Sequence, residues 1–219
     1  MPLKLETVLC IEDAVIGRRI QPVGFLPIGD FDVLELLKPQ NLWFAPRSAI
    51  EDRPDFRQII PYIILRYEAS VVVYQRTSSG GESRLHGVLS LGLGGHVGLD
   101  DVVMDGRIIN VTETLLHTAY REVREEVDVT VIGNRTSFGT IYDNTDAVST
   151  VHLGLVEIWD VNSPHVLSAE ASISECQLIA IDQLESLYAR MEGWSRLCVP
   201  FLLSTGTTQG PTHDNTASV

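Results

Sequence analysis

Two runs of β-branched and aromatic residues, separated by a single residue, constrain the fold of this chain most. The first run is Ile59–Tyr67 and the second is Ala69–Gln75, so only Glu68 stands between them. Such runs predict strands, and so short a connection joins neighbouring strands through a tight turn. Further strands are predicted at Val151–Trp159 and Cys176–Ile181. The middle of the chain is therefore expected to form a β-sheet.

Helical patterns interrupt these strands at two places. A central helix is predicted over Glu113–Val127 with Thr112 as its N-cap, and a closing helix over Ile181–Met191 that Trp194–Leu203 continues. Strands before, between and after the helices indicate an α/β (α+β) fold, a mixed sheet with helices on both faces. The shorter predicted elements are a strand at Leu5–Ile11, a helix at Phe31–Leu37 capped by Asp30, and strands at His86–Leu93, Val129–Ile132 and Phe138–Tyr142.

Composition divides the chain into three parts. Residues 1–58 contain several prolines and no motif, and we expect an N-terminal extension packed on the main domain. Residues 59–204 carry the strand and helix patterns. Residues 205–219 are mostly Thr, Gly, Ser, Asn and Pro, with almost nothing to bury, and predict a disordered tail.

Charge and hydropathy limit the classes of partner. The 219 residues carry a formal net charge of −13, which argues against nucleic-acid and anionic-membrane binders. No apolar stretch approaches the ~20 residues that cross a bilayer, and no signal-peptide pattern is found. Cys10, Cys176 and Cys198 are far apart and form no C-x-x-C, which indicates free thiols in a reducing compartment. We therefore expect a cytoplasmic protein.

A run of charged residues gives the central helix its chemical character. At about 100° per residue, Glu125 and Glu126 fall about −60° and +40° from Glu122, so the three carboxylates share one face. They repel one another and lie at the negative end of the helix dipole. A bound hard cation would offset this repulsion. Salt bridges to Arg121 and Arg124 on a solvated helix face are the other interpretation, and helix geometry alone leaves both open.

The residues around this run resemble the signature of the Nudix hydrolases. Seven residues separate Glu113 from Arg121, as in the signature. The segment Arg121–Val129 then matches the pattern Arg-Glu-hydrophobic-x-Glu-Glu-x-Gly-hydrophobic, except that Asp128 stands where the family has glycine. A glycine there allows a left-handed residue at the end of the helix.

The first half of the signature is displaced in this chain. Gly94–Val97, with the sequence Gly-Gly-His-Val, is similar to the family's Gly-Gly-x-hydrophobic element. It precedes Glu113 by about twelve residues more than the signature allows, so we infer an insertion over Asp101–Thr112. Gly106 is the rival for the signature glycine. We prefer Gly95, because it directly follows a predicted strand.

The resemblance implies a Nudix-like α/β/α sandwich and a set of site residues. The metal ligands for Mg²⁺ or Mn²⁺ would be Glu122, Glu125, Glu126 and the carbonyl of Gly95. The catalytic residues would be Glu122, Glu125 and Arg121, and Arg121 would orient a glutamate. The substrate-binding residues would be Arg76, His96 and Glu113.

The reaction implied by the resemblance is hydrolysis of a pyrophosphate linkage in a nucleoside diphosphate linked to another moiety. The alternative is a non-catalytic Nudix-like domain that binds a nucleotide-type ligand. A relative of isopentenyl-diphosphate isomerase would need a catalytic cysteine in a setting that none of the three cysteines offers. A structural protein with a salt-bridged helix is the last alternative. The partner implied is a small-molecule nucleotide-type substrate. The sequence specifies neither the identity of this substrate nor whether the protein forms a homodimer. Specificity is expected in residues 1–58, 101–112 and 143–150.

Several other side chains are weaker candidates. Asp143 and Asp146 follow a predicted strand and could supply a base or ligand, although Asx-turn chemistry is the preferred interpretation. His152 and Glu157 lie on one predicted strand and could face the same cleft. Trp194 is expected in the core of the closing helix.

Overall fold

The structure is a computed structural model that describes residues 6–21, 24–77, 87–129, 131–169 and 173–206. The predicted tail therefore lies outside the described residues, except for Thr205 and Gly206 at the end of the last helix. The elements are β1 (Thr7–Glu12), α1 (Asp13–Gly17), β2 (Gly24–Pro27), β3 (Leu42–Pro46), α2 (Arg47–Ile50), β4 (Phe56–Tyr67), β5 (Ser70–Arg76), β6 (Leu89–Ser90), β7 (Gly92–Gly94), β8 (Met104–Asp105), β9 (Ile108–Ile109), α3 (Val111–Glu126), β10 (Val127–Asp128), β11 (Val131–Tyr142), β12 (His152–Val161), β13 (Leu167–Ser168), β14 (Ile173–Ala180) and α4 (Gly193–Gly206), with 3₁₀-helices at Val33–Glu35, Pro39–Asn41, Leu99–Asp101, Ser149–Val151 and Ile181–Arg190.

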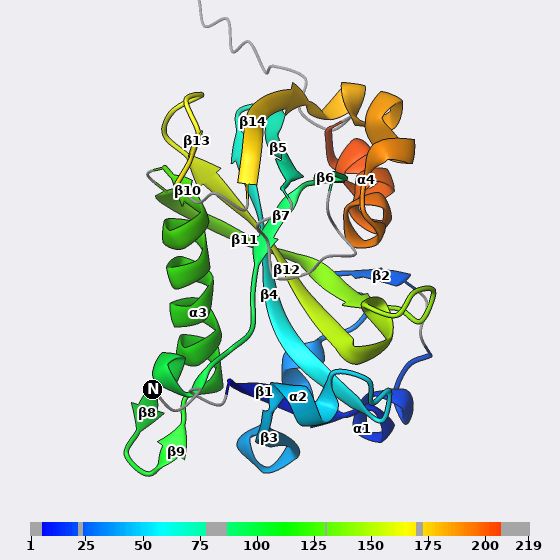
Figure 1. The fold of residues 1–219 in the computed structure, drawn as a ribbon, viewed down its shortest axis with the longest axis vertical. Coiled ribbons are helices and arrows are strands. Elements are labelled where there is room, and N and C mark those ends of the chain that lie inside the picture. The colour runs from blue at the N-terminus through cyan, green and yellow to red at the C-terminus, as the bar shows by residue number, and fades with distance from the viewer. Residues whose placement is uncertain (1–5, 22–23, 78–86, 130, 170–172, 207–219) are drawn as a thin grey trace, which may run out of the picture.

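A mixed sheet of ten strands forms the centre of the molecule (Figure 1), and its main path runs β14-β5-β4-β12-β11-β2. Strands β4 and β12 are parallel, while the other neighbours on this path pair antiparallel. The predicted tight turn joins β4 to β5, and Glu68 in this turn has a φ of 52°. The two predicted strands on either side of Glu68 are therefore adjacent in the sheet.

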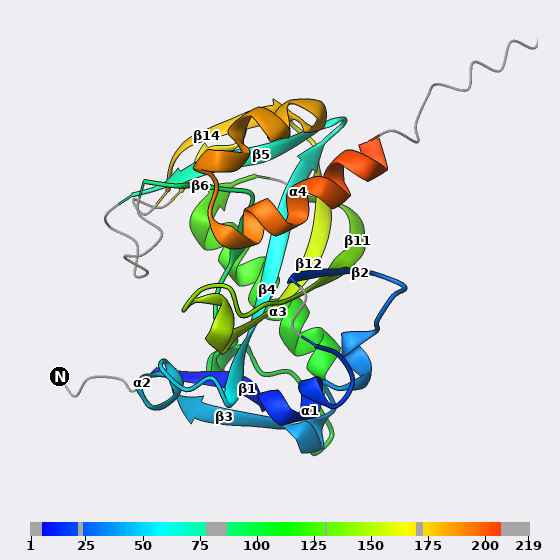
Figure 2. The ribbon, with the colours of Figure 1, turned by 90° about the vertical axis from the view of Figure 1, so that its right-hand side faces the viewer.

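The two long helices cover opposite faces of this sheet (Figure 2). Alternation along β4 explains the layers, because successive side chains of a strand point to opposite faces. Ile60, Tyr62 and Ile64 pack in the cluster that contains the apolar side of α4. Ile63 and Leu65 pack in the cluster that contains the apolar side of α3. The predicted α/β/α sandwich with a mixed sheet is confirmed.

The N-terminal segment belongs to the same sheet. Strand β1 pairs with β3 and with the first residues of β4, and β2 pairs with the end of β11. Strand β1 also contacts the segment that follows β7. The N–H of Leu9 donates to the carbonyl of Val97 at 2.9 Å, and Val8 forms a bridge with Gly98. The N-terminal segment therefore supports the Gly-rich turn directly.

The inferred insertion contains a small β-hairpin. Strands β8 and β9 pair antiparallel, and Gly106 in their turn has a φ of +61°, which glycine adopts readily. Because the hairpin ends just before it, α3 begins at Val111, earlier than predicted. Its N-cap is Asn110 rather than Thr112, since the Asn110 side chain accepts the N–H of Glu113 at 3.1 Å. This Asx cap fixes the start of the helix.

The end of α3 needs no left-handed residue. Val127 is already extended, and Asp128 continues into β10, where it pairs with Leu167 of β13. Among the described residues, Glu68 is the one non-glycine with a positive φ. Asp128 therefore occupies ordinary backbone geometry, which explains how the chain tolerates the absence of the signature glycine.

The closing helix consists of two helices, not one continued helix as predicted. The 3₁₀-helix ends at Arg190, and α4 begins at Gly193. Glu192 separates them, because its carboxylate accepts the N–H groups of Trp194 at 2.6 Å and Ser195 at 2.8 Å. A carboxylate that caps the first turn starts a new helix. Within the described ranges, no helix is both long and apolar enough to cross a membrane.

Candidate active site

A cleft of about 810 Å³ lies where the N-terminal segment, the Gly-rich turn and the start of α4 meet. The N-terminal segment contributes Thr7 and Arg47 to its wall. The turn contributes Gly94–His96, and α3 contributes Arg121 and Glu122. This volume suits a nucleotide-sized ligand.

Gly95 and Glu122 form one corner of this cleft. A Cβ added at Gly95 would lie 2.2 Å from Oε1 and 2.6 Å from Oε2 of Glu122, so a larger residue would displace the carboxylate. The rival glycine, Gly106, has open space at the same position. Glu122 is 14% exposed, and burial raises its pKa against the lowering effect of Arg121. The structure therefore brings Gly95, not Gly106, to the predicted site.

Arg121 links the loop and the helix at this corner. Its Nη1 donates to Oε1 of Glu122 at 2.7 Å and to Oε2 of Glu125 at 3.1 Å. Its Nη2 donates to the carbonyl of His96 at 3.1 Å. The other side of the guanidinium pairs with the buried carboxylate of Asp101. Arg121 therefore contacts Glu122 and Glu125, while its predicted role in orienting a glutamate stays a prediction.

The three predicted glutamates lie within an arc of about 100° on α3 but differ in exposure. Glu122 faces the cleft, Glu125 is 57% exposed, and Glu126 is 6% exposed. Glu126 is close enough to Arg76 for its charge to stabilise the guanidinium. Across the described ranges, no three His, Cys, Asp or Glu side chains form a ready group of metal ligands. The shared helix face therefore exists, but a three-ligand cluster does not.

The donor chemistry at this corner still fits a hard cation. Glu122, Glu125 and Glu126 offer carboxylate oxygens, which Mg²⁺ and Mn²⁺ prefer. The missing side chain at Gly95 leaves its backbone beside the Glu122 carboxylate, so a backbone oxygen could join the set. A cation would compete with Arg121 for Glu122 and Glu125.

Two of the three predicted substrate-binding residues line the cleft. The Nε2 atoms of His96 and His152 lie 3.2 Å apart, and burial lowers the pKa of His96 to about 2, helped by the nearby charge of Arg47. Arg76 donates to the hydroxyl of Tyr74 at 2.9 Å. That hydroxyl in turn donates to the carbonyl of Gly92 at 2.6 Å, which ties Arg76 to the Gly-rich strand.

The third predicted substrate-binding residue, Glu113, lies elsewhere. It is exposed and lines a separate pocket of 290 Å³, together with Phe31 and Arg135. Nine residues along one helix turn a side chain by about 180°, so Glu113 faces away from Glu122. The structure therefore does not bring Glu113 to the cleft beside Glu122, because the helical period points the two side chains in opposite directions.

His152 and Glu157 do not face the same cleft. They are five positions apart along β12, and an odd spacing places two side chains on opposite faces of a sheet. His152 lines the cleft, and its Nδ1 lies 2.7 Å from the carbonyl of Val148. Glu157 lines the pocket of Glu113 and accepts the indole N–H of Trp159 at 2.6 Å.

Sequence reasoning missed other residues of the cleft wall. Arg47, Asp101, Glu192 and Arg196 all line it, and none belongs to a recognised motif. Trp194, expected in the core, is 7% exposed but also lines the cleft. A helix-start pattern could have indicated Glu192. The others come from segments without a readable signal.

The loop after β11 forms a further wall and is held by a buried arginine. Arg57, 1% exposed, donates from Nη1 to the carbonyls of Asp143 at 3.0 Å and Ser149 at 2.7 Å. Its Nε donates to Asp13 of the N-terminal segment at 2.7 Å. Within the loop, Asp146 accepts the N–H of Ser149 at 2.7 Å, in the Asx-turn manner preferred from the sequence.

The comparisons with known proteins agree with this architecture. No protein-family model matches the chain. Protein YmaB of Bacillus subtilis is 32% identical over 165 residues, which cover 71% of this chain and 76% of YmaB. The crystal structure of Tm1382, described as a candidate Nudix hydrolase, superposes with a TM-score of 0.75 and 29% identity, over 91% of this chain and all of that one.

More distant structures share only part of the fold. One is a bifunctional NMN adenylyltransferase/ADP-ribose pyrophosphatase from Francisella tularensis complexed with AMP and manganese, at 13% identity, a TM-score of 0.48 and coverage of 68% of this chain and 42% of that one.

A mixed sheet between two helices, with a Gly-Gly turn against an Arg-Glu-x-x-Glu-Glu helix, defines the class of protein. The chain belongs to the Nudix superfamily. It is similar to Tm1382 over the whole of that chain and to YmaB over 76% of that protein.

Proposed function

We propose that this protein is a divalent-metal-dependent hydrolase that cleaves a pyrophosphate linkage in a nucleoside diphosphate linked to another moiety. The observation that carries the proposal is the corner between Gly95 and Glu122, where a carboxylate and a bare backbone meet at the floor of the cleft. Membership of the Nudix superfamily and the similarity to Tm1382 support the same reaction class.

Mg²⁺ or Mn²⁺, when bound, neutralises phosphate oxygens and lowers the pKa of a water molecule. Glu122, Glu125, Glu126 and the carbonyl of Gly95 would hold this ion. Arg121 keeps Glu122 in place through the bond at 2.7 Å. Either Glu122 or Glu125 would accept the proton of the attacking water.

The cleft also offers groups for the substrate. Arg47, Arg76 and Arg196 line it and would contact phosphate oxygens, for which guanidinium groups are well suited. Apolar side chains of the wall, such as Met191 and Trp194, leave room for the uncharged part of a nucleotide. These contacts explain how an acidic chain could bind an anionic substrate.

A hydrolysis screen tests the proposal. ADP-ribose, dinucleoside polyphosphates, NADH and nucleoside triphosphates would be incubated with the full chain and Mg²⁺ or Mn²⁺. We expect turnover that Glu122→Gln lowers by roughly 10²-fold or more, the scale of a lost acid–base group. Glu126→Gln would be measured in parallel. Glu113→Gln is the matched control, because Glu113 lies on the same helix but outside the cleft.

Two outcomes would contradict the proposal. One is turnover that Glu122→Gln and Glu113→Gln change equally. The other is a wild-type protein that binds a nucleotide of the screen without hydrolysing it in either metal. The second result would instead support the non-catalytic Nudix-like domain.

A further inference from the structure

We propose that Asp101, in the inserted segment, is a positioning residue that holds Arg121 and takes up its charge, so that the glutamates of α3 remain available to a divalent cation. The inference rests on the proposed function, because it concerns the same cation. It also makes the insertion part of the active centre rather than a surface decoration.

The contact between Asp101 and Arg121 is a bidentate ion pair. Nε of Arg121 donates to Oδ1 of Asp101 at 2.7 Å, and Nη2 donates to Oδ2 at 2.9 Å. The N–H of Gly98 donates to the same carboxylate at 2.9 Å. The Asp101 side chain is 3% exposed. Two parallel bonds fix the plane of a guanidinium as well as its position.

This pairing turns most of the guanidinium away from the glutamates. Of its three nitrogens, Nε and Nη2 face Asp101, and Nη1 alone serves both Glu122 and Glu125. Nη2 makes a second bond, to the carbonyl of His96 at 3.1 Å. Asp101 therefore determines which face of Arg121 reaches the helix.

The charges explain why the pair matters for a cation. Burial alone would raise the pKa of Asp101, but the bonds from Arg121 and Gly98 hold it below its ordinary value, so the carboxylate is ionised. The ion pair as a whole then has no net charge. Without Asp101, the full positive charge of Arg121 would act on Glu122 and Glu125 and would compete with a divalent ion.

Two further bonds fasten the inserted segment to α3, on the N-terminal side of Arg121 along the helix. The N–H of Val103 donates to the hydroxyl of Thr114 at 3.0 Å. Nδ1 of His117 lies 3.2 Å from the carbonyl of Asp101. Asp101 itself ends the short 3₁₀-helix Leu99–Asp101. The segment is thus positioned to present one carboxylate to Arg121.

The test measures the affinity of the full chain for Mn²⁺ alone, from the electron paramagnetic resonance signal of the free ion. Asp101→Asn keeps the shape of the side chain and removes its charge. We expect it to weaken Mn²⁺ binding about tenfold, the lower end of the usual cost of losing a group that supports a metal ligand.

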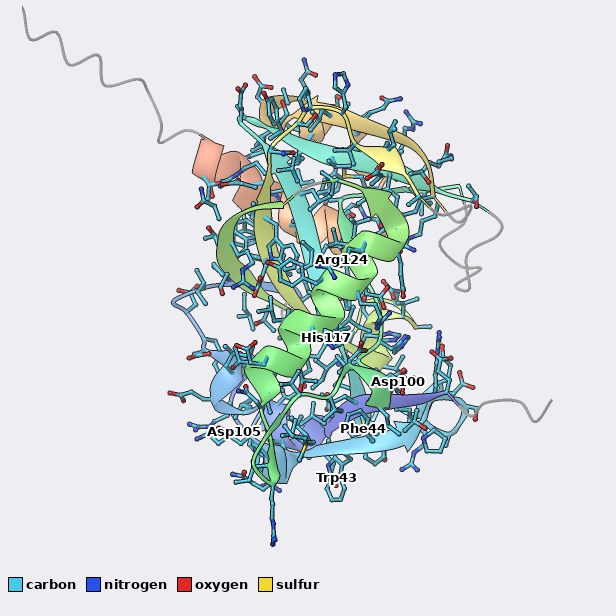
Figure 3. All side chains as sticks on the ribbon, turned by 90° about the vertical axis from the view of Figure 1, so that its left-hand side faces the viewer. Trp43, Phe44, Asp100, Asp105, His117 and Arg124 are labelled. Atoms are coloured by element: carbon cyan, nitrogen blue, oxygen red, sulfur yellow. The ribbon has the colours of Figure 1, made fainter. Side chains whose placement is uncertain are left out.

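Asp105→Asn is the matched control, because it removes the same charge from the same segment. Asp105 is exposed and lies by the first turn of α3, whereas Arg124 lies towards the other end of the helix (Figure 3). We expect Asp105→Asn to leave the Mn²⁺ affinity unchanged. An equal loss in both variants would overturn the inference.

The same substitution is also made in an Arg121→Gln protein. This comparison separates an effect that acts through Arg121 from a direct effect of the Asp101 charge on the ion. In Arg121→Gln, we expect Asp101→Asn to cause no further loss, since the residue it positions is gone. The same loss in both backgrounds would mean that Asp101 acts on the ion directly, and would overturn the inference.

Failure of the inference can be told from failure of the proposed function. A wild-type protein that binds no Mn²⁺ overturns both. Wild-type binding that Asp101→Asn leaves unchanged overturns the inference alone. If Asp101→Asn does not fold, Asp101→Glu replaces it, because it keeps the charge but cannot keep both bonds at the same length. A weaker Mn²⁺ affinity is again expected, and an unchanged affinity would refute the role of Asp101.

Discussion

Gly95 and Glu122 approach each other so closely that a Cβ at residue 95 would lie 2.2 Å from Oε1 of the glutamate. Gly95→Ala must therefore displace the Glu122 carboxylate. We expect the variant to fold and to lose at least about tenfold in Mn²⁺ affinity and in turnover. Titration with Mn²⁺ and initial rates check this. Gly17→Ala is the control, because its Cβ would meet Tyr142 Oη at an ordinary 3.7 Å. Equal behaviour of the two variants would contradict the assigned role of Gly95.

His96 makes the stability of the protein depend on pH. Burial lowers its pKa to about 2 from an ordinary value of 6.5, so the unfolded chain binds a proton in that range and the folded protein does not. Stability is therefore full above about pH 6.5 and falls as the pH decreases. Between about pH 7.5 and pH 5.5 we expect a loss of about 1 kcal/mol from this group. Urea unfolding at both pH values measures it. His96→Gln should reduce the loss, and the exposed His165→Gln should not.

Arg57 holds both ends of the loop that forms one wall of the cleft. The Arg57 side chain is 1% exposed, and Asp13, which also accepts a bond from Tyr142, is half-buried, so Arg57→Gln leaves the two buried carbonyls without their charged donor. We expect a loss of about 2–3 kcal/mol in the free energy of unfolding, the scale of lost hydrogen bonds to a buried charged group. Denaturant titration measures this loss. Arg53→Gln serves as control, since Arg53 makes an exposed pair with Asp55, and a comparable loss there would refute the explanation.

Arg47 is expected to bind substrate from the N-terminal segment. It lines the cleft, and its Nη1 and Nε donate to Glu6 and Glu51 at 3.1 and 3.0 Å. We expect Arg47→Gln to raise KM by about tenfold with a smaller change in kcat, because a charge-assisted bond to the substrate is lost. Steady-state kinetics on the best substrate of the screen check this. Arg53→Gln is again the control, and a similar KM in the two variants would exclude Arg47 from binding.

The sequence predicts those features that depend on local pattern. Ile63 and Leu65 alternate with Tyr62 along one strand, so the sheet and its two helical layers follow from periodicity alone. The corner between Gly95 and Glu122 was also expected, because two short motifs identify its members. Local patterns therefore account for the layers and for the centre of the candidate site.

Features that depend on distant segments could not be predicted in the same way. Asp101 reaches Arg121 because the segment between β7 and the hairpin lies alongside α3, where Val103 bonds to Thr114 and the carbonyl of Asp101 lies near His117, and no local pattern encodes that path. Glu113 shows the converse. Its spacing from Arg121 fits the signature, but the nine-residue spacing between Glu113 and Glu122 points their side chains to opposite sides of α3. A motif fixes the separation of residues along the chain, and the helical period fixes where they point.

The parallel pairing of β4 with β12 has a consequence for how the molecule assembles. The bond from Arg57 to Ser149 joins residues 92 apart, and the bond from Tyr62 to Glu192 joins residues 130 apart. Contacts between residues so far apart in the sequence form late, and on the ribosome they must wait until Ser149 and Glu192 have emerged. Until then, β4 presents an unpaired apolar edge that invites association with other chains. The cleft is therefore completed only after Glu192 and Arg196 of its wall have been synthesised.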